Sequence, residues 1–148
     1  MCGIAGFIDF HKKSTKSNIQ SMIEPLNHRG PDGEGVSLFK SKNAIIGFGH
    51  KRLSIIDLSQ TGKQPMALNH LHITYNGEIY NYLDLKKDLI LSGYKFETES
   101  DTEVIIKLFD LEGKNSFKKY FFEIGPFINL LVIFFFKIFK ANSKDCLM

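Results

Sequence analysis

Short apolar runs alternate with polar turns in the first part of the chain. Residues 3–10 are mostly apolar and include small residues, and they predict a β-strand that starts almost at the chain end. A helix should follow, because apolar side chains then recur at helical spacing. Those side chains are Ile19, Met22, Ile23 and Leu26. Ser17 or Asn18 can cap this helix, and it should end before Gly30. The chain is therefore expected to begin as a strand that leads into an amphipathic helix.

The segments that follow are short and extended. After a dense turn at residues 28–33, the pattern predicts strands at 36–39 and 44–50. Residues 52–58 are compatible with a further extended piece, and residues 59–65 have the composition of a loop. Together these segments indicate a sheet made of short strands.

A second group of elements lies beyond that loop. A strand at 71–75 runs into a turn at 76–78, and a helix that Gly93 can end then carries three apolar side chains on one face. These side chains are Tyr82, Leu85 and Leu89. Residues 94–98 predict another short strand.

The last predicted helix has a marked start. Ser100 and Glu103 have the spacing of a capping box, in which the Glu103 side chain would reach back to the Ser100 amide. Apolar residues continue this helix as far as Gly113, which can end it. Short strands with intervening helices predict an α+β fold.

Composition and charge narrow the classes of function. A length of 148 residues predicts one domain, and a net charge of +3 with scattered Lys and Arg disfavours nucleic-acid binding. Cys2 and Cys146 are too few for a disulfide framework, neither has metal-ligand spacing, and no secretory signal is visible, so the predicted compartment is the cytoplasm. Within the apolar stretch 121–139, the cleanest part, 130–136, is far shorter than the roughly 20 residues of a membrane-spanning helix. Membrane insertion is therefore disfavoured.

Cys2 is the first candidate catalytic residue. Removal of Met1 would give this cysteine a free α-amine, whose reference pKa of about 7.7–8.0 suits a general base for the thiol. Gly3 and Gly6 would let the backbone and a substrate approach closely. Taken alone, Cys2 is better explained as a small buried residue at the start of a strand. The case for catalysis depends on the rest of the chain.

Four further residues carry complementary groups. Asn76 and Gly77 form a turn between a strand and a helix, and their amide donors suit a developing oxyanion. Arg52, at a strand end, can grip a carboxylate through two parallel hydrogen bonds. Asp101, in the first turn of a helix, can pair with an ammonium group. Each residue has an ordinary structural explanation, but together they fit an enzyme that acts on the side-chain amide of a free amino acid.

Six motifs occur along the chain in one order. They are CGIAG at 2–6, HRGPDG at 28–33, HKRLSIID at 50–57, QPM at 64–66, NGEIYN at 76–81 and SDTEVI at 100–105. The series resembles the glutaminase domain of glutamine-dependent asparagine synthetases. Other class II amidotransferases, which also use a cysteine nucleophile, share the opening and the Asn-Gly turn, whereas the RLSI and NGEIYN forms favour the asparagine synthetase branch.

The resemblance implies both a fold and a set of roles. The fold would be a four-layer αββα sandwich of the N-terminal-nucleophile hydrolase type, incomplete at its C-terminal end in this chain. The implied roles are Cys2 as nucleophile, Asn76 and Gly77 as oxyanion hole, Arg52 for the glutamine α-carboxylate, and Asp101 with Glu78 for the α-amine. Ammonia would leave, and water would then release glutamate.

The resemblance covers residues 1–119, which we predict to be a partial glutamine amidotransferase domain. Residues 120–148 match no part of the family and form an apolar tail. This tail could be a frameshifted gene end, a divergent substitute for the missing strands or a membrane-associating segment. We favour the frameshift, because the alternation of apolar and polar residues is lost there.

The ATP-dependent synthetase domain of the family is not visible in this sequence. The resemblance therefore implies a synthetase domain or partner that supplies the aspartate and ATP sites, with ATP and Mg²⁺ expected only there and no cofactor in this chain. Three interpretations stay open: a working glutaminase of this or another class II amidotransferase, a truncated inactive fragment, and a non-catalytic module that only holds glutamine.

Overall fold

Two three-stranded sheets form the framework of the protein. The computed structural model describes three stretches of the chain, namely residues 2–54, 60–121 and 132–137. The first sheet has the strand order β1-β3-β2, and the second has the order β4-β5-β6. The strands are β1 (Gly3–Asp9), β2 (Gly33–Lys40), β3 (Ile45–Arg52), β4 (Met66–Leu68), β5 (Leu71–Asn76) and β6 (Val132–Lys137). The four strand pairings among these described residues are all antiparallel.

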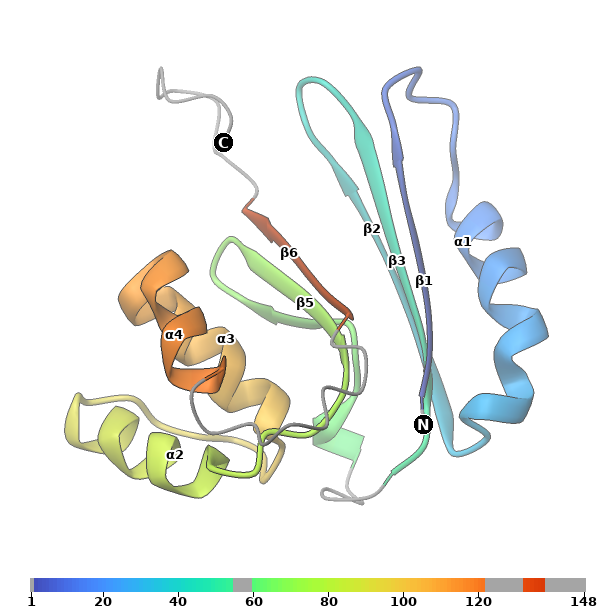
Figure 1. The fold of residues 1–148 in the computed structure, drawn as a ribbon. Helices are drawn as coiled ribbons and strands as arrows, with labels where there is room; N and C mark the ends of the chain where they lie inside the picture. Colours follow the sequence, from blue (N-terminus) through green and yellow to red (C-terminus); the bar gives the residue numbers. More distant parts are fainter. Residues whose placement is uncertain (1, 55–59, 122–131, 138–148) are drawn as a thin grey trace.

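Helices lie on the outer sides of the two sheets. They are α1 (Lys16–Ile23), α2 (Tyr82–Leu91), α3 (Asp101–Glu112) and α4 (Ser116–Phe121). Figure 1 shows α1 against one face of the first sheet, the second sheet on its other face, and α2, α3 and α4 beyond the second sheet. The prediction of an α+β fold is confirmed.

The main apolar core lies between the second sheet and helices α2 and α3. Its buried members are Leu71, Ile73, Tyr75, Ile79, Leu85, Leu89, Val104, Ile105, Ile106 and Leu108. On the other side of the molecule, Ile19 and Ile23 of α1 are fully buried against β3. A Cβ atom at Gly49 would lie 2.3 Å from Ile23 Cγ2, so only glycine lets α1 approach the sheet this closely.

The first helix begins earlier than predicted, and it changes from an α-helix to a 3₁₀ helix before it ends, as predicted, ahead of Gly30. Its N-cap is Thr15, whose backbone N–H is bonded by the Asn18 side chain at 2.8 Å, so the prediction of Ser17 or Asn18 as the cap was wrong. The α-helix ends at Ile23, because Pro25 has no N–H to continue the ladder. The chain goes on as the 3₁₀ helix Glu24–Arg29.

The predicted strand at 94–98 is absent, since this part of the described chain is a loop. Its backbone bonds go to a side chain instead of a neighbouring strand. The Glu103 carboxylate accepts hydrogen bonds from the backbone nitrogens of Glu97 at 3.0 Å and Thr98 at 2.7 Å. The sequence predicted a strand here, but the acceptor that satisfies the backbone of this loop lies on α3.

Of the two hydrogen bonds in the capping box predicted for α3, the bond from the Ser100 N–H to Glu103 was predicted wrongly. Ser100 is the N-cap, and its hydroxyl accepts a 3.1 Å bond from the Thr102 N–H. The Ser100 N–H does not use Glu103, however, but donates to the Thr98 hydroxyl at 3.1 Å. Glu103 is already engaged by the loop before the helix.

Three further predicted segments are described only in part or differ from their prediction, namely 52–58, 59–65 and 120–148. Residues 55–59, which held most of the predicted extended piece, lie outside the described residues. The loop predicted for 59–65 contains a short 3₁₀ helix, Gln60–Gly62, and it leads into β4, which the sequence analysis did not predict. Most of the tail at 120–148 also lies outside the described residues, but β6 within it pairs with β5.

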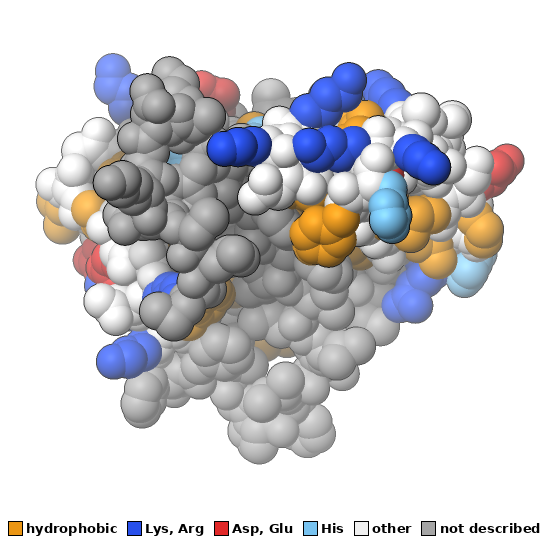
Figure 2. Space-filling model, turned by 90° about the horizontal axis from the view of Figure 1, so that it is seen from above, with side chains coloured by type: hydrophobic (Ala, Val, Ile, Leu, Met, Phe, Trp, Pro, Cys, Tyr) orange, Lys and Arg blue, Asp and Glu red, His pale blue; other side chains and the backbone are white. Residues whose placement is uncertain are grey.

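Basic side chains gather at one end of the first sheet. Exposed lysines from the segment after β1, from the end of β2 and from the β2–β3 turn lie there, namely Lys12, Lys13, Lys40 and Lys42. The Lys12 ammonium donates to the Lys42 carbonyl and ties the two segments together. Figure 2, which views the molecule from this end, shows Lys and Arg side chains spread across it. No helix within the described ranges has both the length and the apolar character needed to cross a membrane.

Candidate active site

The register of β1 and β3 brings the first two candidate residues together. The strands are antiparallel, with Gly3 opposite Lys51. Continued by one residue, this register sets Cys2 opposite Arg52, the last residue of β3. Two segments that are distant in the sequence thus meet where the first sheet ends.

Strand alternation turns Arg52 toward the second sheet. His50, two residues earlier in β3, is fully buried, and its Nδ1 atom lies 3.0 Å from the Thr74 hydroxyl of β5. Gly49 faces the other way, against α1. Because alternate residues of a strand share a face, Arg52 lies on the same face as His50. The predicted carboxylate clamp is therefore on the side of the sheet that faces β5.

Asn76, the last residue of β5, connects the second sheet to Cys2. Its side-chain oxygen accepts a 3.0 Å hydrogen bond from the Cys2 backbone nitrogen. Because the amide oxygen is engaged by this contact, the NH₂ end of Asn76 is the end left for another acceptor. The exposed Gly77 follows, and a Cβ atom there would be 2.7 Å from the Tyr75 hydroxyl oxygen, so glycine fits the turn best.

The sulfur of Cys2 rests on the backbone just beyond β3. The Leu53 N–H donates to Sγ at 3.3 Å, and the thiol lies 3.6 Å from the Leu53 carbonyl oxygen, which can accept its proton. Cys2 is half-buried. A backbone N–H aimed at the sulfur is placed to stabilise negative charge on it.

Leu53 and Asp32 are parts of this arrangement that were not predicted from the sequence. The Asp32 N–H donates to the Arg52 carbonyl at 3.0 Å, and its carboxylate accepts from the Ser54 N–H at 2.8 Å. Asp32 thereby holds the chain on both sides of Leu53. A Cβ atom at Gly30 would lie 2.3 Å from the backbone at the end of β3, so the HRGPDG turn is packed directly onto this segment. The closely spaced turn-forming residues of the HRGPDG motif were the sequence feature that could have indicated their role.

Asp101 lies beneath the turn that follows Asn76. Its carboxylate accepts a 3.2 Å bond from the Ile79 N–H and is almost fully buried at the start of α3. Burial and, to a smaller extent, the nearby Glu78 carboxylate raise the pKa of Asp101 to about 6, although hydrogen bonds from Ile79 and Thr102 act in the opposite direction. The structure therefore joins Asp101 to the Asn76 turn, while Glu78 is exposed beside it.

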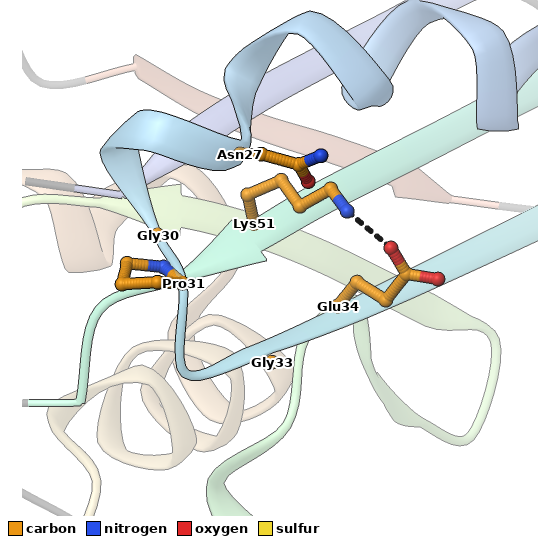
Figure 3. A pocket seen from close by; sticks show the side chains of 6 residues that line it. All are labelled: Asn27, Gly30, Pro31, Gly33, Glu34 and Lys51. Atoms are coloured by element: carbon orange, nitrogen blue, oxygen red, sulfur yellow. Dashed lines mark hydrogen bonds and ion pairs between the residues drawn. The ribbon is translucent and has the colours of Figure 1, made fainter.

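A separate pocket of about 290 Å³ lies on the opposite face of the first sheet. It is lined by Asn27, Gly30, Pro31, Gly33, Glu34 and Lys51. Figure 3 shows the Lys51 side chain directed at Glu34, with which it forms an ion pair. This hydrogen bond lowers the pKa of Glu34, as does a second one from Gln20. The charges in this pocket therefore neutralise each other, and the pocket is not part of the Cys2 arrangement.

Taken together, Cys2, Leu53, Asn76 and Asp101 form a connected group at one end of the two sheets, with Arg52 beside Cys2 by register. Within the described stretches, no group of three or more His, Cys, Asp or Glu side chains is arranged to hold a metal ion. The chemistry that this group offers is a thiol, directed amide donors, a guanidinium and a buried carboxylate.

Comparison with known proteins points to one family. One relative is the Methanocaldococcus jannaschii protein named glutamine-hydrolysing asparagine synthetase 2. The chain is 43% identical to it over 136 residues, and the aligned part covers 81% of this chain and 26% of that protein. It is 42% identical over 112 residues to asparagine synthetase 3 of Bacillus subtilis, covering 72% of this chain and 17% of that protein. Amidase chry2 of Gibberella zeae is 38% identical over 126 residues, 76% of this chain and 18% of its own length.

The chain thus spans about a quarter or less of the length of these relatives. The sequence profile described as the glutamine amidotransferase domain matches residues 1–127, which is most of the chain. The profile match and the identities of about 40% agree with each other. On this evidence the chain belongs to the family of glutamine amidotransferase domains.

Proposed function

We propose that this chain hydrolyses glutamine to glutamate and ammonia, with Cys2 as the nucleophile, and that the ammonia serves asparagine synthesis. One observation carries the proposal. The Cys2 backbone nitrogen lies 3.0 Å from the Asn76 side-chain oxygen, while the Cys2 sulfur is held by Leu53. A nucleophile, its neighbouring amine and an oxyanion donor are thereby gathered at one point.

In the first half of the reaction the Cys2 α-amine, freed by loss of Met1, removes the thiol proton. The thiolate attacks the side-chain carbonyl carbon of glutamine and forms a tetrahedral intermediate whose negative oxygen is bound by the Asn76 NH₂ and the Gly77 N–H. The C–N bond then breaks. The α-ammonium returns its proton to the leaving nitrogen, so that ammonia departs and a glutamyl thioester remains on Cys2.

In the second half a water molecule replaces ammonia. The α-amine takes a proton from the water, the hydroxide attacks the thioester carbonyl, and the same two donors stabilise the second oxyanion. The C–S bond breaks, the thiolate regains its proton, and glutamate is released. The amine of Cys2 thus acts as base and acid in each half.

Recognition of free glutamine requires its two charged groups to be bound. Arg52 would hold the α-carboxylate through its planar fork, and Asp101 would hold the α-ammonium with the exposed Glu78 nearby. The hydrogen bonds from Ile79 and Thr102 leave the Asp101 carboxylate, which can accept about four, with acceptor capacity for an ammonium group.

We further propose that the fold is the four-layer αββα sandwich of N-terminal-nucleophile hydrolases. The presence of α1 outside the first sheet and α2 and α3 outside the second supports this. A synthetase domain or partner would supply the sites for ATP, Mg²⁺ and aspartate, as the names of two relatives suggest. The reducing cytoplasm would keep Cys2 as a free thiol.

The test combines intact mass with an assay of glutamate and ammonia release. We expect the purified protein to lack Met1 and to hydrolyse glutamine, and we expect Cys2→Ala to bind glutamine without hydrolysing it. An active protein that keeps Met1 would overturn the role of the α-amine. A protein that binds glutamine, lacks Met1 and still releases no ammonia would be a holding module, and Cys2 would not be a nucleophile.

A further inference from the structure

Gln64 belongs to the QPM motif, and the proposed mechanism leaves it without a role. Its side chain nevertheless joins two elements of the active site. The Gln64 Oε1 atom accepts a 2.6 Å hydrogen bond from the Tyr75 N–H of β5, and its Nε2 atom donates to the Thr102 hydroxyl of α3 at 3.0 Å. Tyr75 directly precedes Asn76, and Thr102 directly follows Asp101.

The place of Gln64 follows from the register of β4 and β5. Met66 lies opposite Ile73, and continuation of this register by two residues sets Gln64 opposite Tyr75. At this position the side-chain oxygen, instead of a backbone carbonyl, accepts the Tyr75 N–H. The other end of the amide is therefore available to reach across to α3.

The bond from Gln64 to Thr102 also fixes a direction of donation. The Nε2 group can only donate, so the Thr102 hydroxyl oxygen accepts from it. The hydroxyl proton is then left for the Asp101 carboxylate, whose Oδ1 lies 3.5 Å away. Gln64 thus acts on Asp101 through Thr102, and Thr102 is almost fully buried.

The backbone of Gln64 is held from another side. A Cβ atom at Gly35 of β2 would lie 2.1 Å from the Gln64 carbonyl oxygen, so the segment is packed tightly onto the first sheet. A side chain anchored in this way has little freedom to shift along β5. It can serve as a spacer of fixed length between the two parts of the site.

We propose that Gln64 is a positioning residue that sets the separation between the oxyanion donor Asn76 and the carboxylate Asp101. The proposal rests on the proposed glutaminase function. Gln64 touches neither the reacting carbonyl nor the nucleophile. Its consequence is selectivity for an amide that carries an α-ammonium group at the right distance from the carbonyl carbon.

The experiment compares two substrates in matched variants. The substrates are glutamine and glutaric acid monoamide, which is glutamine without its α-amine. We expect Gln64→Leu to lower the ratio of kcat/KM for glutamine to that for the monoamide by about tenfold, the equivalent of one hydrogen-bond-sized energy difference. A variant that only reduces the folded fraction lowers both values equally and leaves the ratio unchanged.

The chain offers a matched control at Gln20. This glutamine is also half-buried and bonds to Glu34 at 3.1 Å, but on the outer side of the first sheet. Gln20→Leu should leave the ratio unchanged. Thr102→Val, which removes the acceptor but keeps the shape, should lower the ratio as Gln64→Leu does, whereas Thr102→Ser should retain it.

Failure of this inference and failure of the proposed function give different results. The same ratio is measured for binding affinities in a Cys2→Ala background, which requires no turnover. Glutamine hydrolysis or binding with a ratio that Gln64→Leu and Thr102→Val both leave unchanged would overturn the positioning role alone. Absence of hydrolysis by the wild-type protein would overturn the glutaminase function. Absence of any glutamine binding would overturn both.

Discussion

Asn76 has two ends with different tasks. Its oxygen is engaged by the Cys2 nitrogen, and its NH₂ is the end proposed to bind the oxyanion. The first contact orients the nucleophile, and the second stabilises charge that exists only during the reaction. Substitution by an isosteric residue can separate the two, because a carboxylate accepts hydrogen bonds but does not donate them.

We expect Asn76→Asp to keep the contact with Cys2 and to fold normally, but to lower turnover by roughly 10²–10³-fold through loss of the donor. Asn76→Ala should lose both contacts and be at least as slow. The measurements are ammonia release and thermal unfolding. Near-normal turnover in Asn76→Asp would remove Asn76 from the oxyanion hole.

The pKa of about 6 for Asp101 predicts a pH limit on glutamine recognition. The carboxylate must be ionised to pair with the α-ammonium group, so the ratio of kcat/KM for glutamine to that for the monoamide should fall about tenfold per pH unit below about pH 6. Protonation of the Cys2 amine lowers both values equally and leaves this ratio unchanged. A ratio that stays flat between pH 7 and about 5 would contradict the amine-binding role.

His50 and Asp101 should affect stability in opposite directions. Burial lowers the pKa of His50 from 6.5 to about 4, so the unfolded chain takes up this proton first and stability falls as pH drops from 6.5 to 4. The pKa of Asp101 is raised from 3.8 to about 6, so the folded chain takes up that proton first and stability rises as pH drops from 6 to 3.8.

The two effects partly cancel between pH 6 and 4 in the wild-type protein. We expect Asp101→Asn to remove one of them and to make the free energy of unfolding fall more steeply with decreasing pH. Urea unfolding at several pH values measures the slope. A slope equal to that of the wild-type protein would mean that the buried carboxylate does not titrate in this range.

Among the elements, those with local signals were predictable. The helical spacing around Ile19 and the alternation before Asn76 are properties of neighbouring residues, and both elements are present. The loop at 94–98 was not predictable in this way, because its acceptor is the Glu103 carboxylate of the next helix. Strand β4 has three residues and exists mainly through its pairing with β5.

The contacts between Glu103 and the loop at 94–98 lead to a prediction about stability. The Glu103 carboxylate accepts bonds from Thr98 and forms a buried ion pair with Lys107. Hydrogen bonds from Lys107 and the loop lower the pKa of Glu103 despite its burial. We expect Glu103→Gln to lower the free energy of unfolding by about 3–5 kcal/mol, because Lys107 would keep a buried charge without its partner.

Asp84→Asn is the matched control for this substitution. Asp84 forms an ion pair with Lys87 on the exposed side of α2, where both side chains are largely in water. Its loss should change stability little. Equal effects of the two substitutions in chemical unfolding would show that burial does not strengthen the Glu103 contacts.

At the scale of the whole molecule, the sequence motifs predicted which residues matter but not how they meet. Cys2 reaches Arg52 only through the register of β1 with β3, and it reaches Asn76 only because the two sheets face each other. The lysines at the other end of the first sheet are likewise separated in the sequence and are gathered only by the fold. Tertiary pairing, which no local pattern encodes, decides both arrangements.

We expect the 148-residue chain to make no asparagine by itself. Transfer of ammonia to aspartate requires ATP to activate a carboxylate, and the sequence has no glycine-rich phosphate loop of the P-loop type or with a Ser-Gly-Gly core. The assay supplies aspartate, ATP, Mg²⁺ and either glutamine or free ammonia. Asparagine and AMP formed from free ammonia would reveal a synthetase site within this chain.

The hydrogen bond between the Cys2 nitrogen and Asn76 has a practical consequence for producing the protein. Any affinity tag or fusion partner joined ahead of Cys2 would convert the proposed catalytic amine into a peptide nitrogen, which is not basic. Such a preparation would fold and bind glutamine, but it would show no activity in a glutaminase assay. Recombinant work should therefore use a fusion whose removal leaves Cys2 as the first residue, with the tagged form kept as a ready-made inactive comparison.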